Sequence, residues 1–300
     1  MTTTASHASG APVAPHRTRP TAGDRAVNVV AHTVLGIWTL LVLLPLLWMI
    51  YTSFKSSQEI LTSPFGLPET MRWDNYMRAW QEARIGDYLL NTVIVVGSAL
   101  VLVMVLGAMC SYVLARFEFR GSRAIYYMLI AGLTFPIFLA VIPLFFVLKG
   151  MGLIGHGPLG LVGVILSYVA FALPFTVFFL YSFFRSLPEE ISEAAAIDGA
   201  GDFRTFFQVM LPMAWPGIVS VAIFNFLGLW NQYLLPLVLN TDRGNYVLAQ
   251  GLVNLQAQQG YRTDWGGMFA SVVITVIPVL AVYVIFQRQL QAGVSPSTDK

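Results

Sequence analysis

The dominant pattern in the sequence is a series of apolar runs, each long enough to cross a membrane. A helix needs about 20 consecutive apolar residues to span a bilayer, and six runs reach that length. They lie at about 28–52, 88–112, 124–148, 159–183, 215–239 and 266–287. No Asp, Glu, Lys or Arg falls inside the last five runs. Because membrane barrels show ~10-residue segments of alternating polarity instead, the pattern predicts an all-α membrane protein with six transmembrane helices.

The polar segment 186–216, called the elbow below, separates the fourth and fifth runs. It opens with Ser186, and Glu189 follows three residues later, which is the spacing of a capping box. A short helix over 187–197 is therefore expected. Gly199 is a natural left-handed stop for that helix.

A second short helix is expected after the glycine. Asp202 is a favourable N-cap residue, and the helix should run to about Met210 and end before Pro212. In the first helix, Ala194 to Ala196 stand where a solvated helix would normally carry charge. Small side chains on an exposed helix indicate that another molecule packs closely against it.

Six spans place both chain termini on the same side of the membrane. The segments on that side contain ten of the 17 lysines and arginines, and those on the other side contain seven. The positive-inside rule therefore favours cytoplasmic termini and a cytoplasmic elbow. The expected organisation is a disordered cytoplasmic tail at 1–25, a six-helix membrane domain at 26–290 with external loops at 53–87 and 241–265, and a cytoplasmic C-terminal tail at 291–300.

The composition and motifs offer little support for catalysis. Only 11% of the residues are charged, against roughly 25% in soluble domains. The sequence holds no HExxH, G-x-S-x-G or GxxxxGK[ST] motif, the four histidines are scattered, and Cys110 is the only cysteine. The stretch Gly150 to Gly155 matches GxGxxG but follows a predicted membrane helix rather than a strand. We therefore expect no catalytic, metal or nucleotide site in this chain.

The membrane spans do carry neutral polar side chains. Asn225 lies in the fifth run, and Trp230, Asn231, Gln232 and Tyr233 form a cluster further along it. Amides match hydroxyl groups without a charge cost, and aromatic faces stack on the apolar faces of sugars. The alternative is hydrogen bonding between helices together with an interfacial aromatic belt. These residues are thus candidates for a path that carries a neutral polyhydroxylated solute.

The elbow contains a recognisable motif. Glu193–Ala194–Ala195, with Gly199 after three further residues and Leu211–Pro212 downstream, resembles the EAA loop of ABC-importer permeases. The segments SFKSSQEI, NTVIVVGSAL, WNQYLLPLVL and IFQRQLQAGV look like the carbohydrate subgroup, specifically the maltose-type G subunit. The resemblance covers nearly the whole chain after the first 25 residues. It implies the type I ABC-importer permease fold with a cytoplasmic EAA coupling helix.

The resemblance also implies roles for individual residues and partners. The residues expected to contact a separate ATPase are Glu193, Ala194, Ala195, Asp198, Gly199 and Ala200. The residues expected to face an extracellular sugar-binding lipoprotein are Asn254, Gln256, Gln258, Gln259, Gly260 and Tyr261. A homologous second permease would complete the path, a dimer of ATPase subunits would hold ATP and Mg²⁺, and this chain would hold no cofactor. Membrane lipid would surround the spans, and no nucleic-acid partner is expected.

The implied protein is a multi-pass subunit of the bacterial cytoplasmic membrane that helps to import a sugar or oligosaccharide. Maltose-, trehalose- and chitobiose-like substrates remain open. One alternative is the same architecture importing another neutral solute, such as a polyol or an amino sugar. A second is an ion-coupled secondary carrier, although the spans lack the charged groups that usually serve one. An intramembrane enzyme would lack catalytic residues.

Overall fold

A computed structural model describes residues 22–155, 157–259 and 264–294. Every regular element in these ranges is a helix, which confirms the predicted all-α class. The chain divides into two units, Met1–Trp48 and Met49–Lys300. The first unit contains most of α1 (Ala22–Thr52), whose apolar side chains are exposed all round. A helix that is apolar on every side is typical of a membrane span.

Two long helices, α4 (Ile85–Arg116) and α7 (Pro158–Ser186), pack along each other in the middle of the second unit. Gly107 allows the close approach, because a Cβ atom there would overlap the side chain of Thr176. Ser111 strengthens it by donating to the carbonyl of Val177 at 3.3 Å. Small residues and hydroxyl groups of this kind are the usual means of joining membrane helices.

Two of the predicted spans each consist of two helices joined at a bend. The third run forms α5 (Ser122–Thr134) and α6 (Ile137–Gly150), bent by 107°. Pro136 explains the break, since proline disfavours helical geometry in the preceding residue, and Phe135 is extended. The fifth run forms α11 (Trp215–Trp230) and α12 (Leu234–Leu239). The runs 124–148 and 215–239 are therefore each divided into two helices.

Four single helices are long and apolar enough to cross a membrane: α1, α4, α7 and α14 (Trp265–Val294). Two bent pairs pass the same test, α5 with α6, and the segment Asp202–Met213 with α11. The described residues therefore contain four spans, or up to six if each bent pair is one span. The second pair shows that the fifth span is continuous with the elbow, because Asp202–Met213 leads into it across a bend of 76°.

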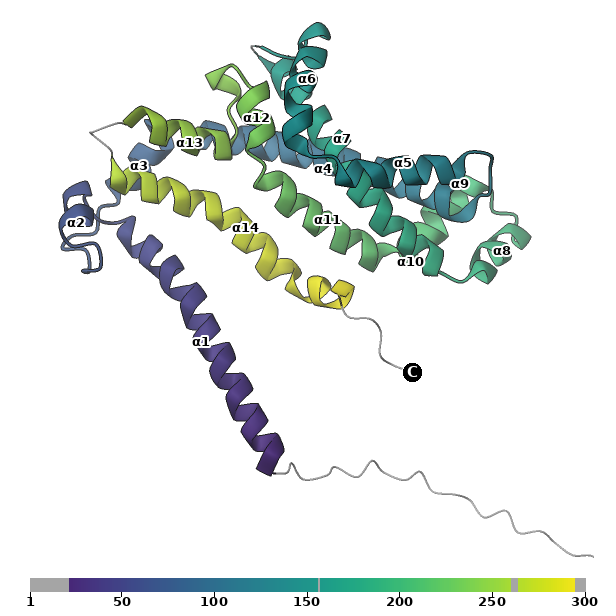
Figure 1. Cartoon of the computed structure of the whole chain (residues 1–300), viewed down its shortest axis with the longest axis horizontal. Coiled ribbons are helices and arrows are strands. Elements are labelled where there is room, and N and C mark those ends of the chain that lie inside the picture. Colours follow the sequence, from purple (N-terminus) through teal and green to yellow (C-terminus); the bar gives the residue numbers. More distant parts are fainter. Residues whose placement is uncertain (1–21, 156, 260–263, 295–300) are drawn as a thin grey trace, which may run out of the picture. The chain divides into compact units, whose positions relative to one another are not determined.

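Apart from α12, which lies beside α6, the shortest helices of the second unit lie toward two opposite ends (Figure 1). One end, called the α3 end, carries α2 (Ser57–Thr62), α3 (Asp74–Gln81), the 3₁₀ turn η2 (Arg243–Asn245) and α13 (Leu248–Gln259). The opposite end, called the elbow end, carries α8 (Glu189–Ile197), α9 (Asp202–Thr205), the π-helix η1 (Phe206–Met210) and α10 (Leu211–Met213). The long spans therefore connect two separate groups of polar and exposed residues.

Candidate functional site

The first helix of the elbow begins later than the sequence suggested. Ser186 is the last residue of α7, and its hydroxyl donates to the carbonyl of Phe183 at 2.8 Å. The N-cap of α8 is Pro188, and no side chain caps the helix. The predicted capping box between Ser186 and Glu189 is therefore wrong, because α7 extends through Ser186 and leaves its side chain engaged with its own helix. The predicted end of α8 at Ile197 is confirmed.

The turn between the two elbow helices has the predicted geometry. Gly199 has a φ of 78°, in the left-handed region that favours glycine. The amide of Ala200 donates to the carbonyl of Ala195 at 2.9 Å, and the amide of Asp198 donates to the carbonyl of Ala194 at 3.0 Å. These backbone bonds satisfy carbonyls at the end of α8 that would otherwise lack partners.

The second elbow helix differs from the expectation at both ends. Gly201 is its N-cap and the side chain of Asp202 makes no capping bond, so the predicted aspartate cap is wrong. The helix does not stop before Pro212 but passes through η1 and α10 to Met213. Single π-helical turns of this kind are frequent at functional sites.

The exposed surface of the elbow is only partly the one predicted. Glu193 and Ala194 are exposed, whereas Ala195 is buried against its own chain. The expectation of exposed alanines over Ala194 to Ala196 is therefore wrong at Ala195 and confirmed at Ala194 and Ala196. Sequence reasoning also missed Ile197, which is 86% exposed, and Phe203, which is 75% exposed. Large apolar side chains held in solvent mark a contact surface when they lie together; here both flank the glycine turn.

The elbow is tied to the spans by an aromatic cluster. Phe206 and Met210 of η1 are buried with Tyr112 of α4 and Phe184 of α7. The ring centroids of Tyr112 and Phe206 are 4.9 Å apart, and those of Tyr112 and Phe184 are 5.6 Å apart. Because such packed side chains do not deform freely, a force on the elbow would be transmitted to both central helices.

The candidate path residues separate into two groups. Asn225 and Gln232 both line a hollow of about 430 Å³. Residues of α5, α6, α7 and α11 also line this hollow. Asn225 is buried and donates to the hydroxyl of Thr176 at 2.8 Å, which matches the alternative of a hydrogen bond between helices. Gln232 accepts from the amide of Leu234 at 3.1 Å.

The other three candidates do not line this hollow. Trp230 is buried, and its indole nitrogen has no hydrogen-bond partner among the described residues. Asn231 is the C-cap of α11, and its side-chain amide donates to the carbonyl of Leu227 at 2.8 Å. Tyr233 is 44% exposed. The break between α11 and α12 therefore places these neighbours in different surroundings.

The predicted external loop 241–265 is largely the helix α13, which carries Asn254 and Gln256. The side chains of Gln258 and Gln259, together with Gly260 and Tyr261, lie outside the described residues. Asn245 anchors the start of the segment by donating to the carbonyl of Gly157 at 2.8 Å. The start of the segment 241–265 is therefore held against the residues that precede α7.

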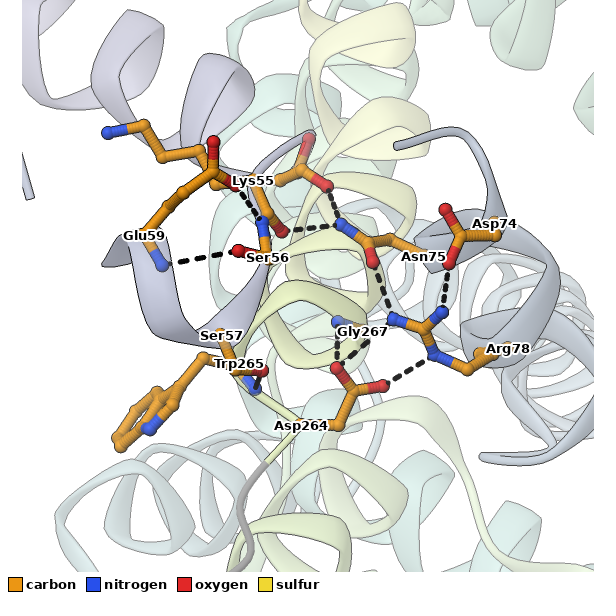
Figure 2. Close-up of polar contacts among 11 residues, drawn as sticks. Lys55, Ser56, Ser57, Glu59, Asp74, Asn75, Arg78, Asp264, Trp265 and Gly267 are labelled. Atoms are coloured by element: carbon orange, nitrogen blue, oxygen red, sulfur yellow. Dashed lines mark hydrogen bonds and ion pairs between the residues drawn. The ribbon is translucent and has the colours of Figure 1, made fainter. Parts of the chain in front are cut away.

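A polar cluster at the α3 end was not foreseen from the sequence (Figure 2). It is centred on Arg78 of α3 and Asp264, which immediately precedes α14. The guanidinium Nε donates to one carboxylate oxygen at 2.9 Å, and Nη2 is 3.3 Å from the other. Arg78 also pairs with Asp74, and its Nη2 donates to the side chain of Asn75 at 2.6 Å.

Asn75 extends the cluster to the segment that follows α1. It is fully buried and donates to the carbonyls of Ser53 at 2.7 Å and Lys55 at 2.9 Å. The amide of Trp265 donates to the hydroxyl of Ser57 at 3.1 Å. The cluster thus links three segments to one another: residues 53–57, the helix α3 and the start of α14. An arginine and an aspartate so far apart in the sequence carry no sequence signal for such a pair.

The electrostatics of the pair are well defined. Burial alone would raise the pKa of Asp264, but hydrogen bonds from Arg78 and the Gly267 amide, with the positive charge of Arg78, more than offset it and hold that pKa below its ordinary value. The hydrogen bond to Asp264 in turn raises the pKa of Arg78. Within the described residues, no three His, Cys, Asp or Glu side chains are placed to hold a metal ion.

The chain combines long apolar spans with a glycine elbow packed onto the central helices and a group of helices held together at the other end. These features define a membrane transport permease rather than an enzyme. Residues 104–296 match the family of binding-protein-dependent transport system inner membrane components. The chain belongs to this family, and it is a permease subunit of an ABC transport system.

Individual relatives agree with this assignment. The chain is 60% identical over 275 residues to the diacetylchitobiose uptake system permease protein NgcG of Streptomyces coelicolor, covering 92% of this chain and 90% of the relative. It is 32% identical over 258 residues to the trehalose transport system permease protein SugB of Mycobacterium tuberculosis, covering 86% and 92% respectively. The fold matches a chain of a bacterial ABC transporter that imports alginate, with a TM-score of 0.76 at 22% identity, covering 89% of this chain and 98% of that chain.

Proposed function

We propose that the chain is a permease subunit of an ATP-driven importer for an N-acetylated disaccharide of the diacetylchitobiose type. The observation that carries the substrate class is the 60% identity to a diacetylchitobiose uptake permease along almost the full length of both chains. The absence of charged residues from the last five apolar runs agrees with a neutral solute. The remaining alternative is another neutral solute, such as a polyol or a different sugar, carried by the same architecture.

The elbow is proposed as the contact with a separate ATPase dimer, which would hold ATP and Mg²⁺. Glu193, Ala194 and Asp198 are exposed on α8 and its C-cap, and Gly199 allows the chain to turn beside them. Ala200 continues this surface, and Ala195 supports it from the buried side. Closure of the ATPase subunits would move the elbow, and the Tyr112–Phe206 packing would carry that movement into the spans as a rigid-body rearrangement.

The solute path is proposed to run beside the hollow that Asn225 and Gln232 line, with a homologous second permease forming the opposite wall. Trp230, Asn231 and Tyr233 would border the same path near the break between α11 and α12. At the α3 end, α13 and the residues after it would face an extracellular binding lipoprotein. In this arrangement both termini and the elbow are cytoplasmic, in a bacterial inner membrane.

The test is uptake of labelled sugars by a bacterium whose copy of this gene has been deleted and then restored. Restoration should recover import of diacetylchitobiose, and unlabelled diacetylchitobiose should compete better than trehalose, maltose or glycerol. Recovery of trehalose or maltose import instead would reject the proposed substrate class but keep the sugar importer. Uptake that persists without ATP and follows an ion gradient would reject the ATP-driven mechanism.

A further inference from the structure

A polar pocket of about 390 Å³ lies behind the elbow, where α4 and α7 end and α5 begins. Three arginines from these helices line it: Arg116 is the last residue of α4, Arg123 lies in the first turn of α5, and Arg185 lies in the last turn of α7. The proposed transport cycle does not use this pocket: Glu189 of the elbow lines it, but the proposed ATPase contacts Glu193, Ala194 and Asp198 do not, and the hollow at Asn225 has a different lining.

The three arginines are not held in ion pairs by residues that the structure describes, although the charges of Glu189 and Glu118 act on Arg185 from a greater distance. None of them forms a salt bridge with a carboxylate of the described residues. Arg116 donates through Nη2 to the carbonyl of Leu187 at 2.7 Å, and Arg185 donates to the hydroxyl of Tyr181 at 2.7 Å. The buried Nε of Arg116 has no hydrogen-bond partner within the described part of the chain. A buried donor without a partner is costly, so an acceptor entering the pocket would be bound favourably.

The charge of the pocket selects the kind of acceptor. Glu118 and Glu189 also line it, so three positive and two negative side chains leave one net positive charge. A monoanion therefore complements the pocket, whereas a dianion would leave an excess of negative charge beside the two carboxylates. Guanidinium groups suit phosphate oxygens in particular, because their donors match phosphate geometry. A phosphodiester meets both requirements.

The surroundings of the pocket favour a lipid as the source of that phosphate. Tyr126 and Tyr181 stack at its edge with ring centroids 4.3 Å apart, and Tyr127 is 66% exposed beside them. Tyrosines are enriched where membrane helices meet the headgroup layer. The helix α5 buries none of its side chains, and it exposes Ile125 and Met128, the sequence neighbours of the lining residues Tyr126 and Tyr127, as an apolar surface on which an acyl chain can lie.

We propose that this pocket binds the phosphodiester headgroup of an anionic phospholipid, with Arg116, Arg123 and Arg185 as its ligands. Basic pockets between membrane helices bind anionic headgroups in this way. The bound lipid would lie against Glu189, the first residue of α8, and beside the Arg116–Leu187 bond that fixes the start of the elbow. The lipid would therefore stabilise the position of the elbow relative to the ends of α4 and α7. This inference does not depend on which solute is transported.

The test measures retention of phosphatidylglycerol by the full-length chain, purified with the subunits that accompany it and placed in phosphatidylcholine nanodiscs with or without phosphatidylglycerol. Native mass spectrometry counts the anionic lipids that remain bound. Removing charge with Arg123→Gln and Arg185→Gln should weaken retention by about fivefold for each arginine removed. Arg116 is left unchanged because it also holds the carbonyl of Leu187.

The matched control is Arg120→Gln, because Arg120 carries the same charge at the same end of the bundle but lies outside the pocket. This control should retain phosphatidylglycerol as well as the unaltered chain does. Arg123→Lys with Arg185→Lys keeps the charge and should recover most of the binding, which separates loss of the site from misfolding. Equal retention by the double glutamine variant and the Arg120→Gln control would overturn the proposal.

A competition arm distinguishes the lipid from a soluble phosphate. Short-chain phosphatidylglycerol should displace a labelled phosphatidylglycerol at lower concentration than inorganic phosphate does, because only the lipid adds contacts with the apolar surface of α5. Displacement by inorganic phosphate at the lower concentration would mean that the ligand is a soluble phosphate, and the assignment to a lipid would be wrong.

Discussion

The Arg78–Asp264 pair allows a quantitative test of how the α3 end is held together. Asp264→Asn removes the carboxylate charge while keeping the shape of the side chain. Hydrogen bonds to charged groups contribute about 1.5–3 kcal/mol each. The side chains of Arg78 and Asp264 are 32% and 34% exposed, and solvent screening reduces this figure. We therefore expect a loss of about 1–2 kcal/mol in the free energy of unfolding, measured as a lower Tm of the purified protein in detergent.

The same pair predicts a pH dependence. The pKa of Asp264 is held below its ordinary value in the folded chain, so the unfolded chain binds the proton more readily. The stabilisation is fully present above the pKa of the unfolded chain, about 3.9, and is lost as the pH falls through the lower pKa of the folded chain. The difference in Tm between the unaltered protein and Asp264→Asn should therefore be constant near pH 7 and shrink as the pH falls below about 4.

A second ion pair in the same region supplies the control. Arg84 and Asp87 are 2.8 Å apart and their side chains are 41% and 58% exposed. Exposed pairs of this kind contribute about 0–1 kcal/mol, so Asp87→Asn should change the Tm much less than Asp264→Asn does. Equal effects of the two substitutions, or a Tm difference at Asp264 that does not diminish in acid, would refute the claim that Arg78–Asp264 braces this end.

Two further predictions test the elbow and the orientation of the chain. Gly199→Trp strains the turn, because its φ of 78° favours glycine, but the residue is exposed and a Cβ atom there meets nothing within 4 Å, so the protein should still insert. Transport and retention of the ATPase should be abolished. Gly152→Trp introduces the same kind of strain, with a φ of 72°, on the loop after α6 and should retain the ATPase, and normal import by Gly199→Trp would disprove the coupling role. A membrane-impermeant maleimide added to intact cells should label Glu69→Cys and spare Glu190→Cys until the membrane is opened, whereas the reverse pattern would invert the proposed topology.

Hydrophobic patterning by itself determined the class of the protein and most of its spans. The helices α4, α7 and α14 lie where the apolar runs predicted them, and α8 ends beside a left-handed Gly199 as expected. These features depend on local properties, because the length of an apolar run and the freedom of a glycine act within a few residues of sequence. The motif in the elbow likewise indicates the family without any tertiary contact.

The tertiary structure decided which side chains face which partners. It buried Ala195 while exposing Ile197, and it paired the side-chain amide of Asn225 with Thr176. It also joined Arg78 to Asp264 across 186 residues of sequence and assembled an arginine pocket from the ends of three helices. Such contacts depend on how separate helices are placed in space, and neither periodicity nor composition along the chain carries that information.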